Sequence, residues 1–167
     1  MKIEIERKFL VRSDAWRSAR DGILYRQGYL CTDPQRTVRI RIGGGTAILA
    51  IKGHGDGLAR PEFEFPIPAA DAEELLEHCC LQPPVEKYRY LVPHAGLTWE
   101  VDEFLGANHG LILAEIELEQ ADQPVALPPW VGAEVTGDPR YYNAYLARQP
   151  YAGWSDQNAG LALKNLT

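Results

Sequence analysis

The sequence predicts an α+β domain built on a closed barrel of eight antiparallel β-strands with flanking helices. Eight segments alternate between polar and apolar residues, which is the pattern of strands with two unlike faces. Helical signals are confined to three short segments, so strands dominate the fold. Eight antiparallel strands can close on themselves, and closure removes the exposed edges of an open sheet.

The predicted strands follow one another along the chain and are separated by turns. Gly43, Gly44 and Gly45 lie between two alternating runs, which predicts a β-hairpin. A phosphate-binding loop is not indicated there, because neither a Lys-Ser/Thr pair nor a helix follows the glycines. In chain order the strands are Lys2–Val11, Ile23–Cys31, Thr37–Ile42, Thr46–Lys52, Leu58–Ile67, Glu86–Val92, Leu97–Phe104 and Leu111–Glu119.

Capping residues and apolar spacing predict the three helices. Ser13 is a candidate cap for a short helix over Asp14–Ala19. Asp138 followed by Pro139 predicts the start of a helix that runs to about Arg148. Asp71 is the candidate cap of the remaining helix, whose apolar face comprises Ala72, Leu75, Leu76, Cys79 and Cys80.

The bulk composition predicts a cytoplasmic protein with neither nucleic acid nor membrane as partner. The chain has 167 residues and a formal net charge of -6, which argues against general nucleic-acid binding. Its three cysteines form no disulfide framework, and no apolar run is long enough for a signal peptide or a membrane span. We expect one barrel domain over residues 1–150 and a loosely packed tail over 151–167.

Charged residues repeat at every second position within six of the strands. Residues two apart share one face of a strand, and like charges so close repel one another. A sheet with a solvated polar face is one interpretation, and it suffices for any single strand. The charged sets are Glu4, Glu6 and Lys8; Arg39 and Arg41; Glu62 and Glu64; Lys87 and Arg89; Glu100 and Asp102; and Glu115, Glu117 and Glu119, while Lys52 ends its strand alone.

A barrel whose charged faces line its interior is the second interpretation. The apolar faces would then pack outward beneath the helices. Interior charges cost on the order of several kcal/mol per ion unless water or a ligand compensates them. The basic strands favour a polyanion, and the acidic strands favour Mg²⁺ or Mn²⁺. A polyphosphate bound together with divalent metal satisfies both.

The order of these motifs resembles that of the CYTH superfamily, also called triphosphate tunnel metalloenzymes, and in particular its short bacterial-type inorganic triphosphatases. Glu4-Ile5-Glu6-Arg7-Lys8 matches the ExExK motif of that superfamily. ExExK alone is a weak signal, whereas the ordered series over residues 1–148 is specific. The series continues with RQGYL at 26–30, RIR at 39–41, IKG at 51–53, EFEF at 62–65, EKYRY at 86–90, EVDEF at 100–104, AEIELE at 114–119 and EVTGDPRYYN at 134–143.

The resemblance implies a tunnel that binds triphosphate with Mg²⁺ or Mn²⁺. It implies metal ligands at Glu4, Glu6, Glu115 and Glu117. It implies triphosphate ligands at Arg39, Arg41, Lys52, Lys87 and Arg89. Further tunnel acids are Glu62, Glu64, Glu100 and Asp102, with roles in holding metal, orienting water or bracing the basic side chains.

Lys8 and Tyr29 are the candidates for proton transfer. Cationic neighbours would lower the pKa of Lys8 and suit it to act as a base, whereas neighbouring carboxylates would raise it. The sequence does not decide between these effects. Tyr29, on the strand that follows, is the candidate to share or relay the proton. Tyr142 follows Arg140-Tyr141 where relatives often carry lysine, so a substrate role at that position is not carried over.

Metal-dependent hydrolysis of inorganic tripolyphosphate to diphosphate and phosphate is the function that the resemblance favours. The alternatives are a thiamine or nucleoside triphosphatase, a class IV-type adenylate cyclase, and a non-catalytic polyphosphate-binding module. A homodimer is compatible with so small a barrel, although no residue specifies it.

Overall fold

The computed structural model describes residues 2–17 and 21–154. Its strands are β1 (Lys2–Val11), β2 (Ile23–Asp33), β3 (Arg36–Gly43), β4 (Thr46–Gly53), β5 (Ala59–Pro66), β6 (Val85–His94), β7 (Leu97–Phe104), β8 (Ile112–Glu117) and β9 (Val131–Glu134). The α-helices are α1 (Ala69–His78) and α2 (Asn143–Leu146). Short 3-10 helices lie at η1 (Asp14–Trp16), η2 (Gly106–Asn108), η3 (Pro139–Tyr141) and η4 (Tyr151–Gly153). Each of the eight predicted strands is present.

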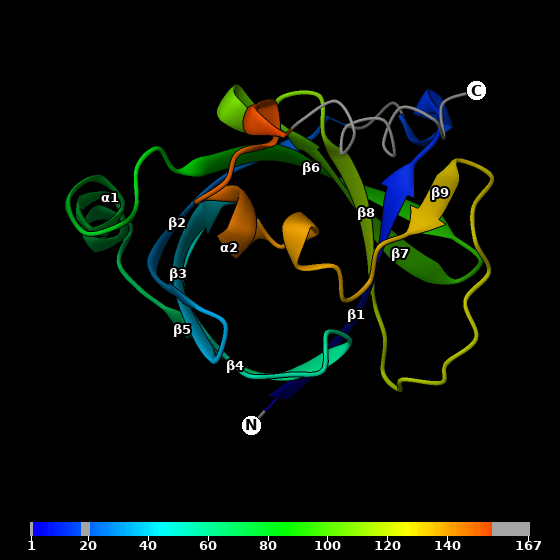
Figure 1. Ribbon diagram of the computed structural model, residues 1–167, viewed down its shortest axis with the longest axis horizontal. Helices are drawn as coiled ribbons and strands as arrows, with labels where there is room; N and C mark the ends of the chain where they lie inside the picture. Colours follow the sequence, from blue (N-terminus) through cyan, green and yellow to red (C-terminus); the bar gives the residue numbers. More distant parts are fainter. Residues whose placement is uncertain (1, 18–20, 155–167) are drawn as a thin grey trace.

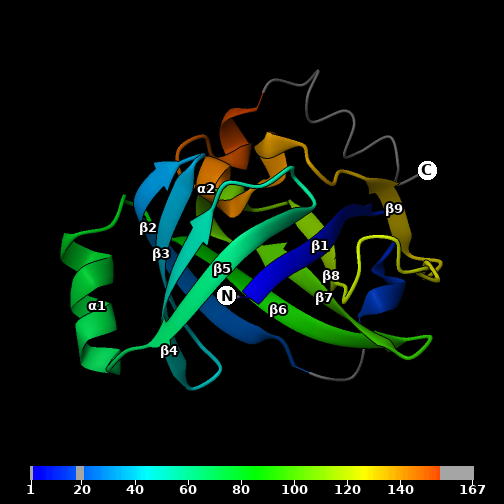
Figure 2. The same cartoon turned by 90° about the horizontal axis from the view of Figure 1, so that it is seen from below.

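The strands close into a barrel in which all neighbours are antiparallel. Their order is β5-β4-β3-β2-β6-β7-β8-β1, and β1 completes the ring by pairing with β5. The N-terminal half of β1 pairs with β5, with Lys2 opposite Glu62, while its central and C-terminal part pairs with β8 (Figure 2). The predicted eight-stranded antiparallel barrel is therefore confirmed.

A ninth strand, β9, was not predicted. It has only four residues, and its sequence VGAE lacks a clear polar and apolar alternation. It pairs with the C-terminal end of β1, opposite Phe9 and Val11, where β1 has already parted from β5. Its hydrogen bonds thus occupy the backbone groups that β1 leaves unpaired there.

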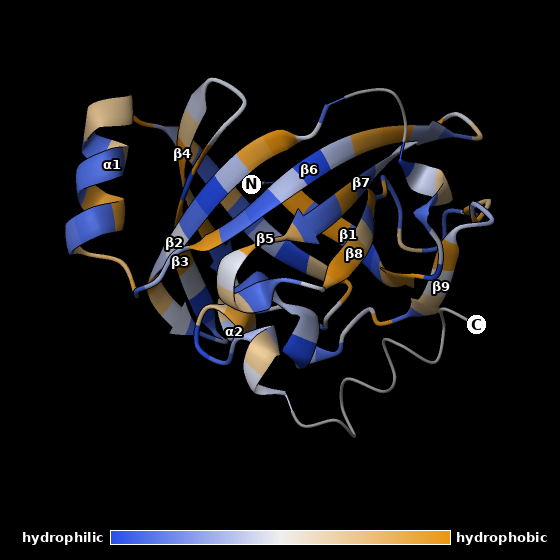
Figure 3. Ribbon diagram, turned by 90° about the horizontal axis from the view of Figure 1, so that it is seen from above, coloured by the Kyte–Doolittle hydropathy of each residue, from blue (hydrophilic) through white to orange (hydrophobic). Residues whose placement is uncertain are grey.

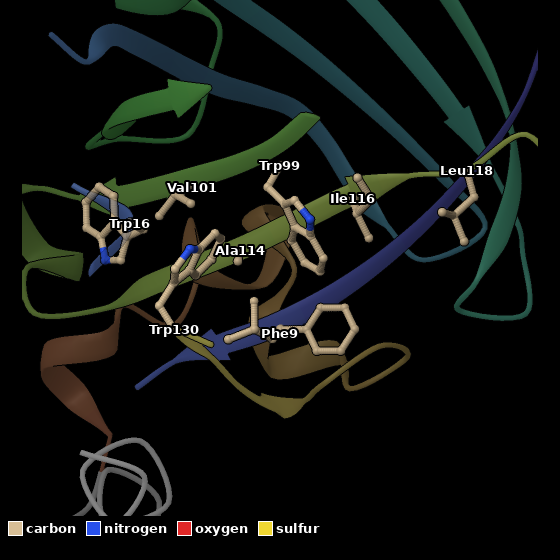
Figure 4. Packing of buried hydrophobic residues seen from close by; sticks show 9 residues of the cluster. Phe9, Trp16, Trp99, Val101, Ala114, Ile116, Leu118 and Trp130 are labelled. Atoms are coloured by element: carbon tan, nitrogen blue, oxygen red, sulfur yellow. The ribbon is translucent and has the colours of Figure 1, made fainter. Parts of the chain in front are cut away.

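Large aromatic residues cover the outer wall of β1, β7 and β8. The Trp99 ring lies between Phe9 and Trp130, with ring centroids 5.5 and 5.7 Å away (Figure 4). Trp16 of η1 packs against the same cluster and contacts Tyr90 edge-on. The loop that carries Trp130 and the turn that carries Trp16 therefore bury the outward apolar face of these strands, in place of the helices that the second interpretation expected.

Helix α1 covers the outer wall of β3 and β4. Ala72 and Leu76 pack there with Ile40, Ala47 and Cys80. The helix begins at Ala69 after Pro68, two residues before the predicted cap Asp71, and no side chain caps it. Cys79 is exposed, so its predicted place on the buried face is wrong: the helix has ended at His78.

The end of the barrel beside α2 is filled by apolar side chains. The inner faces of four strands change there from charged to apolar residues, at Leu10, Val85, Phe104 and Leu113. Tyr141 of η3 and Leu146 of α2 pack into this cluster, and α2 lies across the opening of the ring of strands (Figure 1).

The other two predicted helices are shorter than expected. Ser13 makes no capping hydrogen bond, and the described part of Asp14–Ala19 forms only η1; residues 18–20 lie outside the described part of the chain. Asp138 does cap the turn after Pro139 by accepting a hydrogen bond from the Arg140 amide, but Tyr142 is extended and divides the segment into η3 and α2.

The beginning of the predicted tail is packed. Tyr151 and Trp154 lie against the cluster beneath α2, and their rings are 5.0 Å apart. Loose packing is therefore wrong for these residues, and 155–167 lie outside the described part of the chain. No helix within the described residues is long and apolar enough to cross a membrane.

Candidate active site

The alternating strands enclose a charged cavity of about 670 Å³ inside the barrel. Figure 3 shows hydrophilic and hydrophobic residues alternating along the strands. All the predicted site residues line the cavity except Asp102, which is fully buried behind Lys87 and Arg89. The lining residues among them are Glu4, Glu6, Lys8, Tyr29, Arg39, Arg41, Lys52, Glu62, Glu64, Lys87, Arg89, Glu100, Glu115 and Glu117. The first interpretation, a sheet whose polar face is exposed to solvent, is thereby excluded.

One buried ion cluster joins β1, β4 and β5. Lys52 Nζ lies 2.6 Å from Glu4 Oε1 and 3.0 Å from Glu62 Oε1. Arg60 Nε donates to Glu4 Oε2 at 2.9 Å. Burial raises the pKa of Glu4, but the attraction of Lys52 and Arg60 outweighs it and lowers that pKa to about 2. Glu4 is therefore an anion held by two cations in the metal-free protein.

A second cluster joins β6, β7 and β8. Asp102 accepts from Lys87 Nζ at 2.5 Å and from Arg89 Nε and Nη2, both at 2.7 Å. Arg89 also contacts Glu100, and Glu115 at 3.0 Å. A carboxylate that accepts two parallel hydrogen bonds from a guanidinium group fixes the plane of that group. Asp102 thus acts from behind the cavity wall as a brace for two of the predicted triphosphate ligands.

Lys8 lies among carboxylates. Its Nζ donates to Glu115 Oε1 and lies 3.4 Å from Glu6 Oε1. Burial lowers the pKa of Lys8, but Glu115 and Glu6 outweigh burial and raise it above the ordinary value for lysine. The pKa values of Lys52 and Lys87 are lowered instead, chiefly by burial; Arg39 adds to this effect at Lys52 and Arg89 at Lys87, against the opposing carboxylates Glu4 and Asp102.

Tyr29 lies across the cavity from Lys8. β1 and β2 are separated by three strands in either direction around the ring, so the two side chains come from opposite walls. Tyr29 is almost fully buried, and burial raises the pKa of its phenol despite the opposing charges of Arg39 and Arg60. Tyr29 and Lys8 share no hydrogen bond in the described structure, so a proton could pass between them only through an intervening group.

The basic wall on β3 is poorly neutralised. Among the residues that the structure describes, Arg41 has a single carboxylate contact, Glu64 at 3.3 Å. Within the described residues, Arg39 has no carboxylate at ion-pair distance, and its buried Nε lacks a hydrogen-bond partner. Opposite Arg41 on β2, the fully buried side-chain amide of Gln27 also has no hydrogen-bond partner in the described part of the chain. Unmet donors beside uncompensated positive charge suit an anion with several oxygens.

The glutamates of β1 and β8 suit a divalent cation. Glu6 stands directly opposite Glu117 in the sheet. Burial raises the pKa of Glu6 most, and the negative charge of Glu115 raises it further. The positive charges around Glu6 therefore do not balance the negative charge of its carboxylate. In the described part of the chain no group of three or more His, Cys, Asp or Glu side chains is already arranged to hold a metal ion, since lysines and arginines hold Glu4, Glu115 and Glu117. Hard oxygen donors with excess negative charge nevertheless fit Mg²⁺ or Mn²⁺.

Sequence reasoning missed two residues of this site. Arg60 lies on the inner face of β5 with Glu62 and Glu64, and the same two-residue spacing would have placed it there. Asn143, at the start of α2, accepts a hydrogen bond from Lys87 Nζ at 3.3 Å. Nothing in the strand pattern marks Asn143, because it reaches the cavity from the segment that crosses the barrel end.

Known proteins share this architecture and sequence. A model of the CYTH domain matches residues 2–142. The inorganic triphosphatase of Acetivibrio thermocellus is 47% identical over 153 residues, which cover 92% of this chain and 98% of that protein. That of Nitrosomonas europaea is 40% identical, covering 86% of this chain and 96% of that protein. A crystal structure of an inorganic triphosphatase matches 88% of this chain and 95% of its own, with 33% identity and a TM-score of 0.59.

The matched segment contains every strand of the barrel and all the predicted site residues. On the fold, the cavity and these matches together, the chain belongs to the CYTH domain family.

Proposed function

We propose that this protein hydrolyses inorganic tripolyphosphate to diphosphate and phosphate in the barrel cavity, with Mg²⁺ or Mn²⁺. The observation that carries the proposal is the division of one cavity into an acidic wall on β1 and β8 and a poorly neutralised basic wall on β3. A metal polyphosphate carries both complementary charges. The names of the relatives from Acetivibrio thermocellus and Nitrosomonas europaea support the same substrate.

Triphosphatases of the CYTH family depend on metal in general. Here Glu4, Glu6, Glu115 and Glu117 would hold the ion, which, when bound, polarises phosphoryl oxygens and offsets their negative charge. To reach the ion, Glu4 and Glu115 would loosen their bonds to Lys52 and Lys8. Those lysines would then be free to contact phosphate oxygens.

The basic residues would bind and orient the triphosphate. Arg39 and Arg41 present guanidinium groups suited to bidentate contacts with phosphate oxygens. Lys52, Lys87 and Arg89 add charge from the neighbouring walls. Glu62, Glu64, Glu100 and Asp102 would hold these cations in place, as their ion pairs with Lys52, Arg41 and Arg89 indicate. Apolar packing at the α2 end limits access of water from that side.

Lys8 and Tyr29 stay the candidates for proton transfer. Lys8→Arg and Lys8→Met separate two roles: a base is lost in both variants, whereas a cation that orients Glu115 or phosphate is partly kept by arginine. Tyr29→Phe removes only the phenolic proton. Equal loss of turnover in Lys8→Arg and Lys8→Met supports the base, and wild-type turnover in Tyr29→Phe rules out the relay.

Phosphate release by the purified protein tests the proposed function. The substrates are tripolyphosphate, ATP, thiamine triphosphate and pyrophosphate, each with Mg²⁺, with Mn²⁺ and with chelator. Release from tripolyphosphate that needs metal and falls at least about 100-fold in Arg39→Met supports the proposal. Preference for an organic triphosphate would change the substrate, cyclic AMP formation would indicate a cyclase, and tight binding without turnover would indicate a binding module.

A cytoplasmic location and a homodimer are further predictions. Light scattering of the purified protein at several concentrations measures the oligomeric state, and fractionation of cells measures the location.

A further inference from the structure

Tyr25 lies on the inner face of β2 between the strands that carry two predicted triphosphate ligands. β2 is flanked by β3 and β6, which carry Arg41 and Arg89. The centroid of the Tyr25 ring is 5.5 Å from Arg41 Cζ and 5.7 Å from Arg89 Cζ. One ring therefore contacts both guanidinium groups.

A glycine on β3 provides the space for this ring. Gly43 stands directly opposite Tyr25 in the sheet. A Cβ atom at Gly43 would lie 2.3 Å from Tyr25 Cδ1, closer than any side chain can approach. Gly43 is not among the glycines with positive φ, so the close approach of the Tyr25 ring and of the Leu24 carbonyl oxygen, rather than its backbone conformation, explains the residue. Gly43 thus leaves the room against β3 that the Tyr25 ring occupies.

The ring orients the two arginines without neutralising them. The face of an aromatic ring attracts cations, yet it carries no net charge. Arg41 and Arg89 repel one another, which contributes to the lowered pKa of Arg41 after burial and Arg39. A carboxylate in the place of Tyr25 would hold both side chains but would also compete with phosphate for them. A neutral ring adds no further competitor for phosphate at Arg41, whose carboxylate contact is Glu64, while Arg89 keeps its contacts with Glu100, Asp102 and Glu115.

We propose that Tyr25 is a positioning residue for triphosphate binding, which holds the guanidinium groups of Arg41 and Arg89 toward the cavity. The inference rests on the proposed function and deepens it. Tyr25 does not line the cavity, so it acts through the two arginines and not on the substrate. Its loss should weaken binding of the polyanion and leave the chemical step nearly unchanged.

Steady-state kinetics with tripolyphosphate and Mg²⁺ test the proposal. For Tyr25→Leu we expect KM to rise about 5- to 30-fold, the value of one to two cation–π contacts, with kcat within about twofold of wild type. Tyr25→Phe keeps the ring and should match wild type within about twofold. Tyr88→Leu is the matched control, because Tyr88 is exposed on the outer face of β6. Tyr25→Met replaces the leucine variant if thermal melting shows that it does not fold.

Titration calorimetry of tripolyphosphate binding in chelator separates this inference from the proposed function. If the wild type binds tripolyphosphate but releases no phosphate, the proposed function is wrong, and a loss of affinity in Tyr25→Leu that Tyr25→Phe restores still supports the role of Tyr25. An unchanged KM and affinity in Tyr25→Leu, or equal losses in the leucine and phenylalanine variants, would overturn it. A wild type that neither releases phosphate from tripolyphosphate with Mg²⁺ nor binds tripolyphosphate overturns both.

Discussion

The ion cluster around Glu4 makes the stability of the metal-free protein depend on pH in a defined direction. The Glu4 carboxyl group has an ordinary pKa of 4.5 and a pKa of about 2 in the folded protein. At about 1.4 kcal/mol per pH unit, this difference corresponds to about 3 kcal/mol of stability. Because the folded pKa is the lower one, the contribution is complete above about pH 5 and is lost as the pH falls toward 2.

Replacing Glu4 by glutamine should therefore lower the free energy of unfolding by about 3 kcal/mol at pH 7 and by about 1 kcal/mol at pH 3. Lys52 keeps Glu62 at 3.0 Å, so the variant does not leave that lysine unpaired. Urea unfolding in chelator, followed by the fluorescence of the buried Trp16, Trp99 and Trp130, measures both values.

Glu73→Gln is the control, since the Glu73–Arg26 pair is exposed and should contribute at most about 1 kcal/mol. A Glu4→Gln effect below about 1 kcal/mol at pH 7, or one of the same size at both pH values, would refute the reasoning.

Three further predictions concern other parts of the molecule. Asp102→Asn should lower the free energy of unfolding by about 3–5 kcal/mol in urea, because Lys87 and Arg89 lose their buried counter-charge. Leu76→Ala should cost about 2–5 kcal/mol in the same assay through a cavity beneath α1, without a change in KM. Mg²⁺ added to chelator-treated protein should raise the melting temperature of the wild type, and Glu6→Gln should lose most of that rise; an equal rise in both would remove Glu6 from the metal site.

The inner and outer faces of the strands could be predicted from the sequence because side-chain alternation is a local property. Glu4, Arg39 and Lys87 all face the cavity, as their spacing indicates. The partners of each charge could not be predicted in the same way. Lys8 meets Glu115 rather than cationic neighbours because the register of β1 against β8 puts the two residues opposite each other, and register depends on the whole barrel.

Elements without a strong local pattern were missed or misplaced. β9 has only four residues, and it exists because β1 offers it a free edge. The inner faces of the strands become apolar at Leu10 and Phe104 because Tyr141 and Leu146, from the C-terminal part of the chain, pack against them there. The strand pattern alone does not reveal these partners. Helix α1 begins at Ala69, before the acidic residue that the sequence offers as its cap, since packing against β3 and β4 outweighs a missing cap.

The shared pairing of β1 has a consequence for synthesis on the ribosome. β2 to β5 form successive hairpins, which can pair as soon as they emerge. Lys8 can pair with Glu115 only after 107 further residues have been synthesised, and Arg7 with Glu134 only after 127. At about 5–20 residues per second, the part of β1 that pairs with β8 stays without that partner for at least about 5 s, whereas its N-terminal part can pair earlier with β5. The acidic wall that β1 and β8 share is thus among the last parts of the barrel to form, and the proposed metal ligands come together only at that moment.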